Sequence, residues 1–247
     1  MCKKYCLICD TNTNMRTVEQ IERIKSRFSD PFSVESFLTD SEIQELISMY
    51  ENHTEKTYKN TGPVTVDINS YLTTNIFKSI LDKIQSHIGP FNVAAGMFFQ
   101  TDYPHIIHND DTFLLNDNVY KGITLPLRVS GTAAEPRLCF FNQCYFHGPA
   151  KFFNSDAGIP TYYNTQVYDY ANVDNLSLTE FNEHERLAYL THLKPQWLSG
   201  LSLHSTLPWR IGSALVFDSV RLHCASDFRT QGISKKLGIS IFTNKLT

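Results

Sequence analysis

The chain has 247 residues and a net charge of −3, from 22 lysines and arginines against 25 aspartates and glutamates. This balance argues against a protein that coats nucleic acid or an anionic membrane. Apolar residues make up 42% of the chain and the mean hydropathy is −0.25, which excludes general disorder. We find no run of about 18 apolar residues, so we expect no membrane span. The length suits one domain, residues 1–247.

The N-terminus points to a cytoplasmic protein, because its first residues lack the apolar segment of a secretory signal. Cys2, Cys6 and Cys9 cluster there. A zinc knuckle would need a fourth ligand, and the nearest histidine is His53. We therefore expect reduced thiols.

Helices are predicted for the first third of the chain. Apolar residues spaced for one helix face begin at Val18, in a helical lead-in over residues 1–30, and residues 31–34 read as extended. Thr39 and Glu42 form a capping box, and the apolar positions after it predict an amphipathic helix. A third helix is expected over residues 76–88, ended by Gly89.

After Gly89 the pattern changes to short apolar or alternating runs that predict strands. These runs are residues 92–100, 122–129, 138–142, 214–218 and 236–243. A long insertion, residues 143–210, is rich in aromatic residues and is expected to contain a helix that starts at the capping box Ser177 to Glu180. It is a possible substrate lid. Helices followed by strands favour an α+β fold with a mainly β core and an antiparallel sheet pair.

The most informative segment contains His108-x-Asp110. On an extended segment, residues i and i+2 project from the same side, so both can bind one metal ion. His223, soon after the strand 214–218, can supply a third ligand. Two histidines and one carboxylate are the ligand set of non-haem Fe(II). Alone, H-x-D is a weak motif.

A second feature lies on the strand over 236–243. Lys236, Gly238 and Ser240 share one face, opposite three apolar residues. A buried Lys236 would need an anion, for which a ligand carboxylate is a candidate, with Ser240 adding a hydrogen bond. Thr124, on another strand, can also hydrogen-bond a bound ligand. The alternative is a pair of lysines, Lys235 and Lys236, at the solvated start of an edge strand.

Taken in order, these motifs resemble the iron(II)/2-oxoglutarate-dependent oxygenases. His108-x-Asp110 is followed by the segment 212–218, by His223 and then by a basic residue on the next strand. Within that superfamily the chain resembles the prolyl-hydroxylase and phytanoyl-hydroxylase-like branch. Residues 31–50 also resemble the helical segment with which members of this branch begin.

The resemblance implies a double-stranded β-helix, a cupin-like jelly roll with the N-terminal helices packed on its larger sheet. It implies that His108, Asp110 and His223 bind Fe(II), with 2-oxoglutarate and O2 as co-substrates. Lys236 would pair with the distal carboxylate of 2-oxoglutarate, with Lys235 or Arg229 as substitutes, although Arg229 follows His223 too closely.

The expected reaction is hydroxylation of an unactivated C–H bond with release of succinate and CO2, because the family members that halogenate lack the acidic ligand. The substrate would be a small molecule or a peptidyl side chain. Two other functions stay open: a metal-binding cupin-like enzyme that does not use 2-oxoglutarate, and a jelly-roll module that only binds a partner.

Neighbouring residues are assigned lesser roles. His105 is expected to be structural, the alternative being a group that supports the ligands or contacts substrate. Asp111 and Asn109 should face away from the metal because they alternate with the ligands. Arg128 shares the predicted face of Thr124 and could meet an acidic substrate, or it could be a surface residue. The aromatic residues between 140 and 170 could wall a pocket or form a satellite core.

Overall fold

The structure is a computed structural model, and it describes residues 15–57, 63–111, 117–132, 134–150 and 173–246. Cys2, Cys6, Cys9 and most of the aromatic loop lie outside these residues. The helices are α1 (Val18–Lys25), α2 (Asp40–Asn52), α3 (Asn75–Ile88) and α4 (Glu183–Tyr189), with 3-10 turns η1 (Asn69–Tyr71) and η4 (Pro195–Leu198). The strands are β1 (Phe32–Val34), β2 (Val64–Asp67), β3 (Phe91–Thr101), β4 (Val119–Gly131), β5 (Arg137–Tyr145), β6 (Val173–Asp174), β7 (Leu203–Pro208), β8 (Ala214–Asp218), β9 (Arg221–Ala225) and β10 (Ile233–Lys245).

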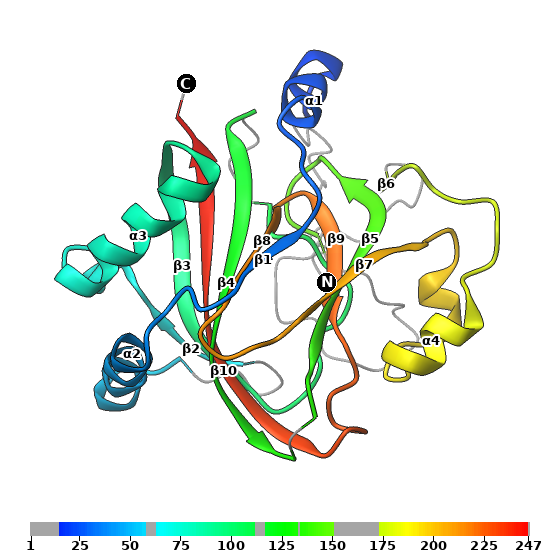
Figure 1. Ribbon diagram of the computed structural model, residues 1–247. Coiled ribbons are helices and arrows are strands. Elements are labelled where there is room, and N and C mark those ends of the chain that lie inside the picture. Colours follow the sequence, from blue (N-terminus) through cyan, green and yellow to red (C-terminus); the bar gives the residue numbers. More distant parts are fainter. Residues whose placement is uncertain (1–14, 58–62, 112–116, 133, 151–172, 247) are drawn as a thin grey trace, which may run out of the picture.

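Two antiparallel sheets make up most of the fold (Figure 1). The larger has six strands in the order β1-β8-β4-β10-β3-β2. The smaller has the order β6-β5-β7, and β9 also pairs with β5. The long strands β4 and β10 lie at the centre of the larger sheet, side by side with antiparallel register. The mainly β architecture with antiparallel sheets therefore agrees with the prediction.

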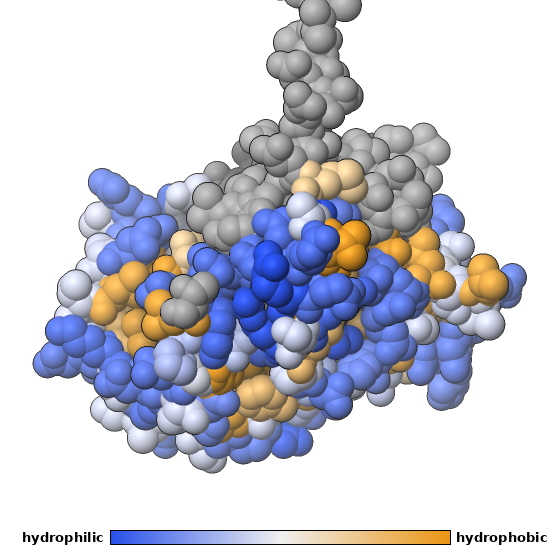
Figure 2. Space-filling model, turned by 90° about the horizontal axis from the view of Figure 1, so that it is seen from above, coloured by the Kyte–Doolittle hydropathy of each residue, from blue (hydrophilic) through white to orange (hydrophobic). Residues whose placement is uncertain are grey.

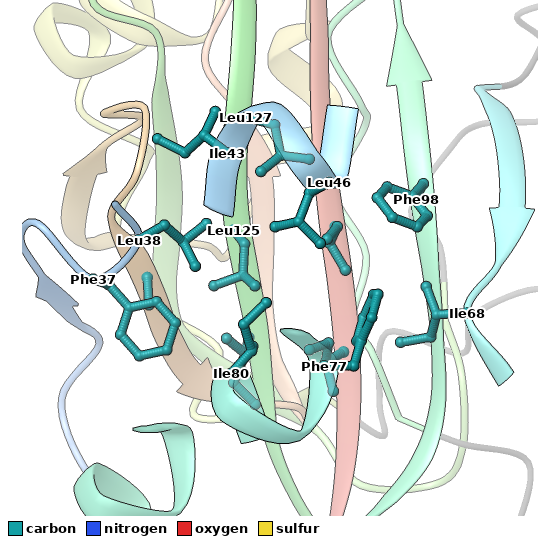
Figure 3. Packing of buried hydrophobic residues seen from close by; sticks show 14 of the residues in the cluster. Phe37, Leu38, Ile43, Leu46, Ile68, Phe77, Ile80, Phe98, Leu125 and Leu127 are labelled. Carbon is teal, nitrogen blue, oxygen red and sulfur yellow. The ribbon is translucent and has the colours of Figure 1, made fainter. Parts of the chain in front are cut away.

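Helices α2 and α3 cover one face of the larger sheet (Figure 1). The capping box of Thr39 and Glu42 is present at the start of α2, as predicted. Figure 3 shows side chains from α2 and α3, among them Leu46 and Phe77, pointing at the sheet residues Phe98 and Leu125. Burying these side chains stabilises the layer by roughly 1.5–3 kcal/mol for each large apolar group. The core therefore lies on the helical face and leaves the other face for the site.

The smaller sheet faces a second apolar cluster. Cys139 and Cys224 belong to it, together with Leu190 after α4 and Trp197 and Leu198 in η4. The exposed surface seen in Figure 2 carries separate hydrophobic patches among hydrophilic residues. None of the helices in the described part of the chain has the length and apolar character that crossing a membrane requires.

The predicted start of the helix in the insertion 143–210 was wrong. Helix α4 begins at Glu183, and its N-cap is Asn182, whose side chain accepts from two backbone amides. Ser177 instead bonds Thr179, since short hydroxyl side chains also stabilise turns. The end of the insertion forms β7, which pairs with β5 and is thus part of the smaller sheet.

Candidate metal centre

The structure brings His108, Asp110 and His223 together, and each offers one ligand atom within 4.8 Å of the other two. Nε2 of His108 lies 3.6 Å from Oδ1 of Asp110, and Nε2 of His223 lies 3.4 Å from Oδ2. Three ligands at right angles around one ion, each about 2.1 Å away, lie about 3 Å apart. The arrangement fits a divalent metal ion.

Backbone hydrogen bonds hold these ligands at a common position. His108 and His223 form an antiparallel bridge, in which each backbone amide donates to the other residue's carbonyl, at 2.9 and 2.8 Å. The Asp110 amide donates to the Ser219 carbonyl at 2.8 Å. His223 lies in β9, a strand that the sequence did not predict, so sheet pairing fixes both its neighbours and its direction.

The tautomers of both histidines are set by carbonyl oxygens. Nδ1 of His108 lies 2.8 Å from the Ile106 oxygen, and Nδ1 of His223 lies 3.0 Å from the Arg221 oxygen. A carbonyl oxygen only accepts, so each Nδ1 carries a proton, and Nε2 is the ring atom that faces Asp110 and is available to bind a metal ion. Such carbonyl partners are typical of metal-binding histidines.

The residues next to Asp110 face away from the ligands, as predicted. Asn109 donates from its side-chain amide to the carbonyls of Tyr145 and Gly148, at 3.0 and 3.1 Å. Asp111 forms a fully buried ion pair with Arg16, with a contact of 2.9 Å between Nη2 and Oδ1. These contacts fasten one side of Asp110 to the end of β5 and the residues after it, and the other side to the segment before α1.

Gly122 on β4 gives Asp110 the space it occupies. A Cβ atom at this position would lie 2.7 Å from the Phe217 ring and 3.3 Å from Oδ2 of Asp110. The ring of Phe217 lies 4.6 Å from that of His223. Gly122 and Phe217 therefore pack directly against the ligand group, and no periodic pattern in the sequence identifies them.

Lys236 is buried on the face of β10 opposite the helices. It is 2% exposed, and its ammonium has no hydrogen bond or ion pair with any residue that the structure describes. Burial lowers the pKa of Lys236 from 10.5 to about 7, against smaller opposing effects of Cys139 and Cys224. Such a group is costly without an anion, so the site favours an anionic ligand.

Lys235 and Arg229, the other two candidates for binding the distal carboxylate, are both exposed to solvent. Ser240 on β10 lies directly opposite Thr124 on β4. Thr124 is buried and two residues from Gly122, so it projects from the face that meets Asp110. Thr124 and Ser240 thus lie on the face of β4 and β10 that is turned toward the His-Asp-His group, as predicted.

Arg128 does not share that face. The register between β4 and β10 shifts between Leu237 and Gly238, so that Arg128 lies opposite Leu237. Leu237 packs in the helical core, and Arg128 pairs with Glu51 of α2 at 2.6 Å. The β-bulge turns the arginine toward the helices, which rules out the predicted contact with an acidic substrate and leaves the surface role.

His105 lies beside the ligands, its ring 4.2 Å from that of His108. The sequence also gave no indication of Trp209 and Phe228, whose rings lie 4.1 and 4.5 Å from the Lys236 ammonium. Both residues come from segments outside β10. Only the tertiary structure brings them to Lys236.

Comparisons with known proteins agree with this fold. No protein-family model matches the chain, and no curated protein sequence matches it. The solved structure of the non-heme alpha ketoglutarate dependent epimerase SnoN from nogalamycin biosynthesis has a TM-score of 0.51 at 13% identity, covering 93% of this chain and 84% of that chain. The alpha ketoglutarate dependent carbocyclase SnoK has a TM-score of 0.50 at 10% identity, covering 91% and 83%. At these identities the likeness shows a shared fold.

Proposed function

We propose that this protein is an Fe(II)- and 2-oxoglutarate-dependent oxygenase whose two sheets form a double-stranded β-helix. The observation that carries the proposal is the combination of a His-Asp-His group with Lys236, which is buried and forms no ion pair with any described residue. SnoN, which is similar in fold, has been solved with Fe3+ and alpha ketoglutarate. Two independent features of the site therefore support the same pair of ligands.

In this proposal each part of the site has one task. His108, Asp110 and His223 would hold Fe(II), which would then be open to the co-substrate and O2. Lys236 attracts the distal carboxylate of 2-oxoglutarate, and Thr124 and Ser240 add hydrogen bonds. Iron, when bound, activates O2 at the expense of 2-oxoglutarate, which becomes succinate and CO2.

We further propose hydroxylation of an unactivated C–H bond in a small-molecule or peptidyl substrate, in the cytoplasm. The presence of Asp110 supports hydroxylation, because the carboxylate fills the position that a halide would need. The fold alone admits other oxidations, since SnoN is an epimerase and SnoK a carbocyclase.

The test measures binding in the absence of oxygen, followed by turnover. Calorimetry should show one equivalent of Fe(II) bound, and 2-oxoglutarate binding only to the metal-loaded protein. The change His223→Ala should lower metal affinity by about 100-fold or more, because it removes a ligand outright. His184→Ala, at an exposed histidine on α4, is the matched control and should leave affinity unchanged.

The outcomes separate the three functions considered for the chain. Succinate formed from 2-oxoglutarate under air supports the oxygenase. Metal binding that is unaffected by 2-oxoglutarate would indicate a cupin-like enzyme of another kind. A protein that binds no metal would indicate a jelly-roll module that only binds a partner. Equal metal affinity in wild type and His223→Ala would show that the ligand group is wrongly assigned.

A further inference from the structure

Two aromatic rings enclose the ammonium of Lys236. Its Nζ lies 4.1 Å from the ring centroid of Trp209 and 4.5 Å from that of Phe228. Trp209 precedes β8 and Phe228 follows β9, and the two side chains are 3% and 0% exposed. Two segments that are distant in the chain thus each place an aromatic ring against the Lys236 ammonium.

Gly238 on β10 leaves room for the Trp209 indole beside Lys236. A Cβ atom on Gly238 would lie 2.9 Å from Cζ2 of Trp209, so the indole rests against a strand surface that lacks a side chain. The indole also packs edge-on against Phe99 at 5.8 Å. Its position is therefore fixed by the sheet and does not depend on Lys236.

A cation over an aromatic face is stabilised by the ring quadrupole, most strongly where water is excluded. No carboxylate among the described residues pairs with Lys236. The rings are thus the groups that favour its charge before a ligand binds. They also restrict a side chain whose four-carbon stem is otherwise flexible.

We propose that Trp209 and Phe228 are positioning residues that keep Lys236 charged and directed at the distal carboxylate of the co-substrate. The inference rests on the proposed function, and it assigns to these two residues the preference for a dicarboxylate over a 2-oxo acid with one carboxylate.

The titratable groups around Lys236 do not replace this effect. Cys139 on β5 and Cys224 on β9 are buried thiols, and burial raises the pKa of Cys224 well above its usual value. Burial lowers the pKa of His192 to about 4, so its ring is neutral near pH 7. Lys236 is then the group whose charge changes near neutral pH.

The experiment compares two ligands over a range of pH. Anaerobic calorimetry on the Fe(II)-loaded protein gives the affinities for 2-oxoglutarate and for 2-oxopentanoate, which lacks the distal carboxylate. Their ratio removes effects on the metal ligands, which both compounds share. In the wild type the ratio should fall by up to tenfold per pH unit above about pH 7, as Lys236 loses its proton.

Trp209→Leu and Phe228→Leu should each move this fall to lower pH by about one unit, which at pH 8 makes the ratio about tenfold smaller. Trp209→Phe keeps an aromatic face and should retain most of the wild-type ratio. Trp197→Leu is the matched control, because this tryptophan is also buried but belongs to the other cluster. If Trp209→Leu does not fold, Phe228→Leu, which removes less volume, still tests the inference.

The two hypotheses fail in different ways. If wild-type protein binds both compounds equally, Lys236 does not meet the distal carboxylate and the proposed function loses its support. If the wild type prefers 2-oxoglutarate but both leucine variants keep the same ratio and pH profile, the aromatic residues are structural only and the inference is overturned.

Discussion

Replacing Lys236 with methionine should stabilise the ligand-free protein while lowering its affinity for 2-oxoglutarate to about that for 2-oxopentanoate. The folded-state pKa of Lys236 is lowered to about 7 from 10.5 by burial. Methionine has a similar length and no charge, so it fills the same space without the cost of burying an ammonium. A binding residue that destabilises its own fold is the expected mark of a functional position.

The size of the effect follows from linkage. Below pH 7 lysine is charged in both states, and the folded state bears the whole cost of about 3.5 pKa units, or roughly 5 kcal/mol. Between pH 7 and 10.5 the unfolded chain holds one more proton, so wild-type stability rises with pH in this window. The advantage of the methionine variant should therefore shrink to roughly 2 kcal/mol at pH 9.

Urea unfolding at pH 6 and pH 9 measures this difference directly. Lys235→Met is the matched control, because Lys235 is exposed on the same strand and should change stability by less than about 0.5 kcal/mol at both pH values. Added 2-oxoglutarate should raise the melting temperature of the metal-loaded wild type more than that of metal-loaded Lys236→Met. A Lys236→Met protein that is less stable at pH 6, or whose advantage does not depend on pH, would refute the reasoning.

Two further changes test the support around the ligands. Gly122→Ala should weaken metal binding and lower the free energy of unfolding by about 1–3 kcal/mol, because the new Cβ meets the Phe217 ring and approaches Asp110. The control Gly96→Ala, which clashes with Ile68 on the helical face, should lower stability while leaving metal affinity unchanged. Equal metal affinities in both variants would contradict this reasoning. Arg16→Ala should cost about 3–5 kcal/mol in urea unfolding, since it removes the cation that is paired with the buried Asp111 carboxylate. The double variant with Asp111→Leu should recover most of that loss, and a failure to recover would show that the ion pair is not the cause.

Local interactions account for what the sequence determined by itself. The capping box at Thr39 involves residues three apart, so it forms wherever α2 forms, and the strand 214–218 was predicted with its observed bounds. Alternation along an extended segment correctly placed Asp111 away from the ligands. Alternation also placed Lys236 opposite the apolar face of β10. Each of these inferences depends on neighbours within a few residues, where backbone geometry alone fixes direction.

Tertiary structure decided what depends on pairing between distant segments. The bridge between His108 and His223 joins β9 to a loop far away in the chain, and no local pattern announces it. A bulge on β4 turned Arg128 to the helical side, because one extra residue reverses every side chain beyond it. Trp209 and Phe228 reach Lys236 only because β8 and β9 position the segments beside them. Spacing could thus name the candidate ligand residues, but the groups packed around them are set by sheet register and by contacts between distant segments, which a single sequence does not encode locally.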